Sequence, residues 1–121
     1  MKTIHVYQYP KCSTCRKALQ FLDAHGVRYT KSDLVAEPVS LEKMTDLYRR
    51  SGLPLSRMFN TSGESYRAGG FKDRVRTMTE AEALRALASD GKLVKRPIVD
   101  TGTVVLVGFD AKAFDAVAEG E

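Results

Sequence analysis

The chain of 121 residues has the length of one domain, and its 43% hydrophobic and 28% charged residues are the balance of a globular protein, which excludes a fibrous or disordered chain. The net charge of +4 comes from basic residues spread along the sequence, so no basic run indicates direct binding to nucleic acid. No stretch approaches the roughly 20 apolar residues that span a bilayer, and the start from Met1 to Val6 is too briefly apolar for a signal peptide. We therefore expect a single domain over residues 1–121, a cytoplasmic monomer without membrane contact.

The N-terminal part of the chain predicts a strand, a helix and a second strand. Thr3 to Tyr7 alternates apolar and polar residues and predicts a short strand that ends before Pro10. From Ser13 to His25 apolar residues recur at helical spacing, and Gly26 is the expected helix stop. Val27 to Lys31 is the next strand candidate. The order indicates a βαβ unit.

The middle of the chain predicts helices. Ser40 can cap a helix that runs to about Arg50, and Leu55 to Arg76 contains turn signals between short helical pieces. Thr79 followed by Glu82 is a capping box, and it opens a helix for which Gly91 is the expected end.

The C-terminal part predicts a hairpin and a last helix. Ile98–Val99 and Thr103 to Val107 are β-branched, apolar runs, and Asp100-Thr101-Gly102 between them is a hairpin signal. The last helix is expected to begin at Asp110. The complete order of elements is that of an α/β chain with the plan of a thioredoxin-like fold.

The chain has two cysteines, Cys12 and Cys15, separated by two residues. In a reducing cytosol such a pair is catalytic, redox-sensing or metal-binding, although two structural cysteines remain an alternative. Zinc needs four ligands, and His5 and His25, which alone could complete the set, lack paired ligand spacing. We therefore expect no metal site and interpret the pair as a redox-active dithiol.

Cys12 is expected at the entrance of the first helix, where unpaired main-chain N–H groups stabilise a thiolate. Lys11 and Arg16 add positive charge within about one helical turn, which favours the thiolate further. Ser13 and Thr14 are expected to offer their main-chain N–H groups to a bound anion.

Cys15 falls one turn further along the helix, in the same stripe as the apolar residues. From this buried position it can attack a mixed disulfide formed on Cys12 and release the product. The sequence therefore predicts a nucleophile at Cys12 and a resolving thiol at Cys15.

The chain resembles the arsenate reductase and Spx family of thioredoxin-fold proteins. Four segments carry the likeness, in family order: Tyr9-Pro10-Lys11-Cys12-Ser13-Thr14-Cys15-Arg16-Lys17-Ala18, Phe59-Asn60-Thr61-Ser62-Gly63, Lys95-Arg96-Pro97-Ile98-Val99 and Leu106-Val107-Gly108-Phe109. The resemblance implies an α/β thioredoxin-like fold with a mixed central sheet and a helical insertion, for which the segment from Ser40 to Ser89 is the candidate.

The resemblance also implies roles for residues that their local sequence leaves unremarkable. Arg96 would precede a cis-proline at Pro97 and face the thiol, where its fork of donors suits an oxyanion or a thiolate. Arsenate reductases coupled to glutathione and glutaredoxin use three arginines around the oxyanion and lack the second cysteine. The approximate counterparts of the other two arginines are Asn60 and Gly108, which weakens the case for arsenate unless Arg57 or Arg67 substitutes.

Three functions follow as hypotheses. The first is a thiol–disulfide oxidoreductase acting on a small disulfide or oxyanion, with no bound cofactor and with glutathione, glutaredoxin or thioredoxin as external reductant. The second is an Spx-type redox-sensing regulator that binds the RNA polymerase alpha subunit, for which Gly52 could serve the contact. The third is a glutathione- or glutaredoxin-coupled arsenate reductase.

Overall fold

The computed structural model describes residues 4–119, and the side chains of residues 4–118. The chain divides into two compact units, Met1–Asp33 with Arg96–Glu121 and Leu34–Lys95. Thr3, which the expected first strand included, lies outside the described residues.

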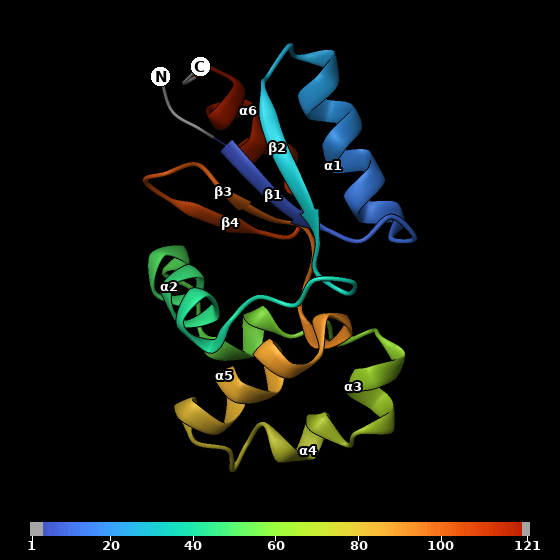
Figure 1. Cartoon of the computed structure of the whole chain (residues 1–121), viewed down its shortest axis with the longest axis vertical. Helices are drawn as coiled ribbons and strands as arrows, with labels where there is room; N and C mark the ends of the chain where they lie inside the picture. Colours follow the sequence, from blue (N-terminus) through green and yellow to red (C-terminus); the bar gives the residue numbers. More distant parts are fainter. Residues whose placement is uncertain (1–3, 120–121) are drawn as a thin grey trace. The chain divides into compact units, whose positions relative to one another are not determined.

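The first unit is a four-stranded sheet with two helices (Figure 1). Its elements are β1 (Ile4–Gln8), α1 (Ser13–Ala24), β2 (Tyr29–Asp33), β3 (Ile98–Asp100), β4 (Val105–Val107) and α6 (Ala111–Glu119). The strand order is β2-β1-β3-β4, in which β1 and β2 are parallel while β3 is antiparallel to both β1 and β4. The βαβ unit, the hairpin and the mixed central sheet are thereby confirmed.

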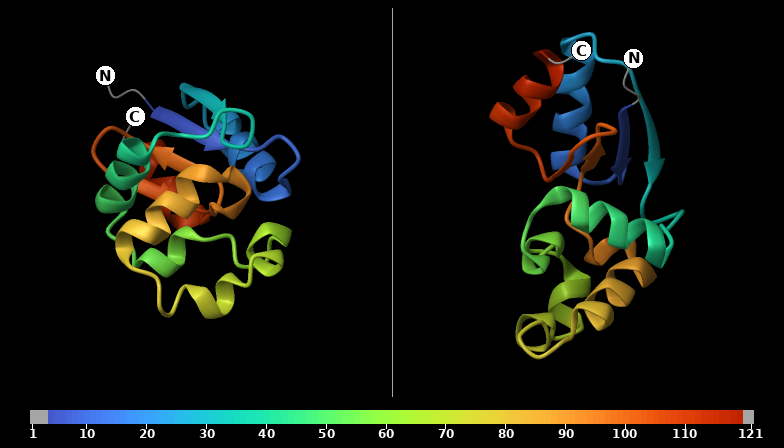
Figure 2. Two further views of the ribbon diagram at one scale, coloured as in Figure 1. Left: turned by 60° about the horizontal axis from the view of Figure 1, so that its bottom comes forward. Right: turned by 90° about the vertical axis from the view of Figure 1, so that its left-hand side faces the viewer.

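Both helices of this unit pack on the same face of the sheet, as Figure 2 shows in its right-hand view. Because side chains alternate across a strand, β1 directs Ile4 and Val6 to that face. They meet Ala18 and Leu22 from the buried stripe of α1, together with Phe114 of α6. The helix that carries Cys15 and is capped by Cys12 is thus anchored by its inner side to the central strand.

The second unit is helical and stands in the chain between β2 and β3. Its elements are α2 (Leu41–Ser51), the short 3₁₀ helix η1 (Leu55–Met58), α3 (Glu64–Ala68), α4 (Phe71–Arg74), α5 (Glu80–Ser89) and the 3₁₀ helix η2 (Gly91–Leu93). α2 and α5 pack together and bury Met44, Leu47, Leu84 and Leu87. Ser40 caps α2, as expected, by accepting a hydrogen bond from the Lys43 N–H at 3.1 Å.

Gly91 has a different role from the helix stop that the sequence suggested. α5 ends at Ser89, and Gly91 opens η2 instead. A Cβ atom at this position would collide with the main chain of Leu34. The glycine is therefore required by close packing between two segments that are far apart in the sequence.

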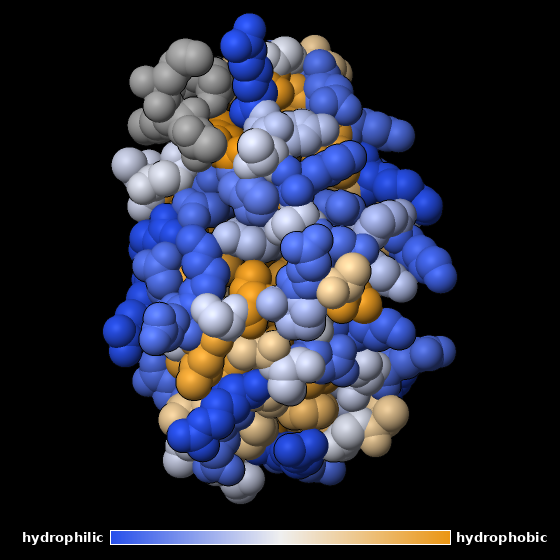
Figure 3. Space-filling view, in the orientation of Figure 1, coloured by the Kyte–Doolittle hydropathy of each residue, from blue (hydrophilic) through white to orange (hydrophobic). Residues whose placement is uncertain are grey.

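No helix within residues 4–119 combines the length and the apolar character needed to cross a membrane. The face shown in Figure 3 is mostly hydrophilic, with small separate apolar areas. Among the described side chains, the exposed large apolar ones are Leu41 and Val104.

The capping box of α5 is complete. The Thr79 hydroxyl accepts a hydrogen bond from the Glu82 N–H at 3.2 Å, and the Glu82 carboxylate accepts one from the Thr79 N–H at 3.2 Å. We expect Thr79→Ala to lower the free energy of unfolding by about 1 kcal/mol because a helix donor loses its acceptor. Urea unfolding measures this, with Thr61→Ala at an exposed turn as the matched control. An equal loss in both variants would contradict the assignment.

Candidate active site

Cys12 is the N-cap of α1, with extended backbone angles of φ −92° and ψ 117°. Its Sγ atom accepts a hydrogen bond from the Cys15 N–H at 3.4 Å, and its own N–H donates to the Tyr9 carbonyl at 3.0 Å. The side chain is half-buried. The sulfur therefore takes the place of a capping oxygen at the helix start, where main-chain N–H groups favour negative charge.

Cys15 lies one turn further along α1 and is fully buried, with 0% of its surface exposed. It shares the inner stripe of the helix with Ala18 and Leu22. Both cysteines are free thiols. The expected division into an accessible and a covered sulfur is thus present in the geometry.

The sheet brings Arg96 to the dithiol. β1 and β3 pair antiparallel with Tyr7 opposite Ile98, so the residues just beyond these strand ends run side by side. The Arg96–Pro97 peptide bond is cis, as the resemblance implied, and the Pro97 carbonyl accepts the Gly108 N–H at 2.8 Å. Arg96 is half-buried, and its guanidinium hydrogen-bonds to Cys12.

The two thiols differ in acidity. Burial raises the pKa of Cys12, but hydrogen bonds from the side chain and main chain of Cys15 and from Arg96 lower it by more, so the pKa lies below its ordinary value. Burial raises the pKa of Cys15 to about 12, and the hydrogen bond to Cys12 acts in the same direction. Because the thiolate is the nucleophilic form, Cys12 is the reactive sulfur of the pair.

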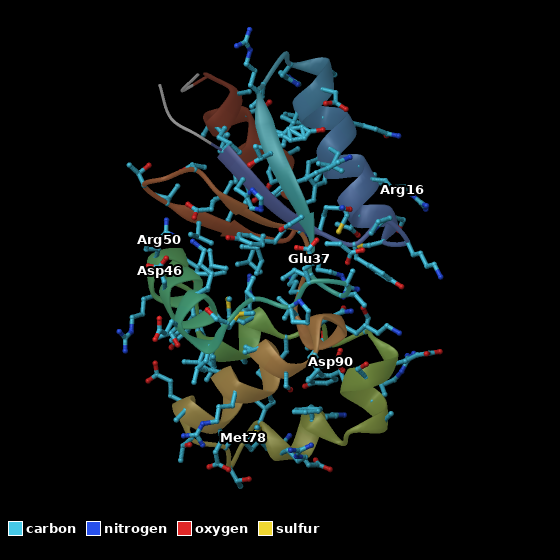
Figure 4. All side chains as sticks on the ribbon, viewed as in Figure 1. Arg16, Glu37, Asp46, Arg50, Met78 and Asp90 are labelled. Carbon is cyan, nitrogen blue, oxygen red and sulfur yellow. The ribbon has the colours of Figure 1, made fainter. Side chains whose placement is uncertain are left out.

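The other predicted residues near the dithiol are exposed. Lys11 precedes Cys12, while Ser13, Thr14 and Arg16 are in the first turns of α1. Figure 4 shows Arg16 extending from α1 away from the sheet. These side chains form a polar, cationic rim on the accessible side of the helix start.

Asn60 belongs to the second unit, and its role in the site stays a prediction. Its N–H donates to the Leu93 carbonyl at 2.7 Å, and its side-chain oxygen accepts from the Ser62 hydroxyl at 3.3 Å. Gly108, the other counterpart of an arginine, is buried with φ 83° and follows β4. Its main-chain contact with Pro97 supports the segment that carries Arg96.

Tyr9 was not among the predicted site residues. The carbon at the centre of the Arg96 guanidinium lies 5.2 Å from the centroid of the Tyr9 ring. The signal available in the sequence is an aromatic residue directly before Pro10, in the loop that leads to the reactive cysteine. That signal does not reveal its partner, because Arg96 is distant in the chain.

Metal ligation finds no support among residues 4–118, where no group of three or more His, Cys, Asp or Glu side chains could hold a metal ion. The two ring nitrogens of His5 hydrogen-bond to the hydroxyls of Thr30 at 2.6 Å and Ser32 at 2.9 Å. His25 is the exposed C-cap of α1.

The fold and this site define a thioredoxin-like protein with a dithiol at the start of its first helix. The model of the ArsC family matches residues 7–117, and the chain therefore belongs to the ArsC family. This confirms both the resemblance and the thioredoxin-like fold that it implied.

The relatives extend over almost the whole chain. The uncharacterized protein YusI of Bacillus subtilis is 45% identical over 90% of this chain and 92% of its own length. The crystal structure of an ArsC family related protein from Bacteroides fragilis superposes with a TM-score of 0.91 and 39% identity, covering 94% of this chain and 96% of that one.

More distant relatives carry two kinds of name. An arsenate reductase of Neisseria meningitidis is 27% identical over 97% of this chain and 99% of its own. The global transcriptional regulator Spx of Lactiplantibacillus plantarum is 23% identical over 87% of this chain and 78% of its own. The chain is thus related to both arsenate reductases and Spx proteins.

The difference in acidity predicts selective alkylation. In the reduced protein at neutral pH, iodoacetamide is expected to modify Cys12 and leave Cys15 intact, because only Cys12 is both accessible and acidic. Peptide mass spectrometry identifies the modified residue, and the pH midpoint of the rate is expected below about 8.5. First modification at Cys15 would contradict the geometry.

The same pKa shifts predict opposite effects on stability. The raised pKa of Cys15 contributes stability that is complete below the unfolded pKa, about 8.5, and is lost as the pH rises toward about 12. The stability difference between the parent and Cys15→Ala is therefore expected to shrink between pH 8 and roughly pH 10.5 in reducing urea titrations.

Cys12→Ala is the matched control for this measurement. The lowered pKa of Cys12 contributes stability that is complete above the unfolded pKa and is lost as the pH falls through the folded pKa. The difference in the free energy of unfolding between the parent and Cys12→Ala is expected to grow as the pH rises toward about 8.5. Slopes of the same sign for both variants would refute the assignment of the two thiols.

Proposed function

We propose that this ArsC-family protein is a thiol–disulfide oxidoreductase in which Cys12 is the nucleophile and Cys15 the resolving thiol. The observation that carries the proposal is the half-buried Cys12 sulfur, which accepts hydrogen bonds from the Cys15 N–H and Arg96, one helical turn before a fully buried thiol. This arrangement combines an accessible thiolate with a second thiol that solvent does not reach.

In the first step the Cys12 thiolate attacks one sulfur of a substrate disulfide. A bond forms between Cys12 and that sulfur, the substrate S–S bond breaks, and the other half leaves as a thiolate. Before the attack, the positive charge of Arg96 stabilises the Cys12 thiolate. As the negative charge moves during the reaction, the same guanidinium would stabilise the charge that develops on the leaving sulfur. We assign Arg96 as the catalytic cation on this basis.

In the second step Cys15 gives its proton to the thiolate released in the first step, and its sulfur attacks the Cys12 sulfur. The remaining half of the substrate leaves as a thiolate, and a Cys12–Cys15 disulfide forms. The substrate gains two electrons and the protein loses two. Glutathione, glutaredoxin or thioredoxin, as an external dithiol or pair of thiols, would return them.

The exposed rim would bind the substrate. The N–H groups of Ser13 and Thr14 at the helix start suit an anionic group, and Lys11 and Arg16 add positive charge in solvent. Pro97 would present its main chain beside the thiolate. We propose that the chain acts as a single cytoplasmic domain and a monomer.

A second candidate is a redox-sensing regulator, favoured by the relatives named Spx and by the dithiol itself. There, formation of the Cys12–Cys15 disulfide would change binding to the RNA polymerase alpha subunit. Gly52, the residue considered for that contact, is the left-handed C-cap of α2 with φ 68°. Its conformation explains a glycine at this position without a partner.

Arsenate reduction is the third candidate, supported by the relatives of that name. Asn60 and Gly108 count against it, because they stand where the resemblance implies two arginines that bind the oxyanion. Each charge-assisted hydrogen bond lost in this way is worth about 1.5–3 kcal/mol. Arg57 and Arg67 are both exposed in the second unit and would have to supply the missing donors.

Reductase assays separate these candidates. With a small disulfide as substrate, NADPH oxidation coupled in turn to glutathione, glutaredoxin and thioredoxin is expected to show turnover that Cys12→Ser abolishes. Cys15→Ser retains the attacking sulfur and is expected to accumulate a mixed disulfide on Cys12, seen as added mass in intact-protein spectra. Arsenate replaces the disulfide in a parallel series.

The decisive negative result is full turnover by Cys12→Ser, or none by the parent with any reductant. Absence of turnover together with retention on the purified polymerase alpha subunit, dependent on the oxidation state of the dithiol, would favour the regulator instead. Turnover with arsenate alone would favour the third candidate.

A further inference from the structure

Tyr9 contacts Arg96 and both cysteines of the candidate site. Its ring lies 5.2 Å from the centre of the Arg96 guanidinium, its carbonyl accepts the Cys12 N–H at 3.0 Å, and its main chain hydrogen-bonds to the Cys15 thiol. Each of these contacts lies within the first unit. One residue of the loop between β1 and α1 thus connects the cation with both sulfurs.

We propose that Tyr9 is a positioning residue, whose ring face holds the Arg96 guanidinium in place against the Cys12 sulfur. The inference rests on the proposed function, in which the Cys12 thiolate is the attacking group. Nothing in the resemblance or among the predicted site residues assigned this role to Tyr9. It deepens the proposal by stating what keeps the catalytic cation in position.

The separation of 5.2 Å lies within the range of about 6 Å over which a guanidinium is attracted to an aromatic face. Both side chains are half-buried, so water screens the attraction less than at an open surface. The arginine side chain loses rotamer entropy when it is fixed. A ring that already stands beside the guanidinium offsets part of this cost.

The backbone explains why the ring is available there. Tyr7 of β1 pairs with Ile98 of β3. Tyr9 follows Tyr7 and Arg96 precedes Ile98, so the antiparallel register places Tyr9 and Arg96 on neighbouring chain segments. Pro10 restricts the preceding residue to extended conformations. The hydrogen bond to the Cys12 N–H then couples the position of Tyr9 to the helix start.

The test titrates Cys12 in a Cys15→Ser background, so that Cys12 is the one thiol that contributes thiolate absorbance. The ultraviolet absorbance of the thiolate gives the ratio of thiolate to thiol at each pH. Tyr9→Leu removes the ring and is expected to lower this ratio about two- to fivefold at fixed pH, which is the equivalent of a cation–π contact of about 0.5–1 kcal/mol. Tyr9→Phe retains the ring and is expected to keep the ratio close to that of the background.

A double-mutant cycle with Arg96→Met shows whether the ring acts through the cation. In the Arg96→Met background Tyr9→Leu is expected to leave the ratio unchanged, because there is no guanidinium left to position. Tyr29→Leu is the matched control, since Tyr29 lies in the same unit and its hydroxyl donates to Asp23 instead. It is expected to leave the ratio unchanged in both backgrounds.

Three results would overturn the proposal. They are an unchanged ratio in folded Tyr9→Leu, an equal decrease with and without Arg96, and a decrease in Tyr9→Phe as large as in Tyr9→Leu. If Tyr9→Leu does not fold, the Arg96 side-chain N–H resonance of the parent, identified by its loss in Arg96→Met, decides. An upfield ring-current shift supports the contact, and an unshifted resonance refutes it.

These readouts do not require turnover. If the reductase assays fail but Tyr9→Leu lowers the thiolate ratio only when Arg96 is present, the proposed enzyme activity is removed and the positioning of Arg96 by Tyr9 stands. If the parent shows turnover but Tyr9→Leu does not change the thiolate ratio, the oxidoreductase proposal stands and the role of Tyr9 is removed. The two proposals therefore fail separately.

Discussion

The properties of this site depend on how negative charge on the Cys12 sulfur is stabilised. Burial by itself raises the pKa of that thiol, and the hydrogen bonds from Cys15 and Arg96, together with the positive charge of Arg96, reverse the direction. One turn further along α1 the same side chain is buried without a comparable set of donors, and its pKa rises to about 12. The pKa values of two identical side chains are thus shifted in opposite directions by their surroundings alone.

The first unit supplies those surroundings through its sheet. β1 leads into the loop that ends at Cys12, and β3, its antiparallel neighbour, begins directly after Pro97. The core beneath α1 anchors the helix, so its N-terminus is presented at a fixed place relative to the strand ends. The pairing of β1 with β3 is therefore what turns an isolated acidic cysteine into a sulfur with a cation beside it.

Membership of the ArsC family fits this arrangement, because relatives with different names can share one piece of sulfur chemistry. A thiolate that attacks, and a second thiol that resolves, serve equally for reduction of a substrate and for sensing of oxidation. In our proposal, what would differ among these functions is the partner that meets the exposed rim around Lys11 and Arg16. The rim is solvated and cationic, which suits an anionic or polar partner more than an apolar one.

Features set by neighbours in the chain could be predicted from the sequence. The capping box of Thr79 and Glu82, the helix that begins beside Cys12 and the burial of Cys15 all follow from spacing within a few residues, since helix caps and amphipathic stripes are local. That Arg96 lies beside Cys12 was predicted from the family likeness alone. Its contact with Tyr9 was predicted neither from that likeness nor from local spacing. The need for glycine at Gly91 was likewise hidden, because the colliding atoms belong to a distant segment. Those contacts depend on strand register and on packing between remote parts of the chain, which no short stretch of residues encodes.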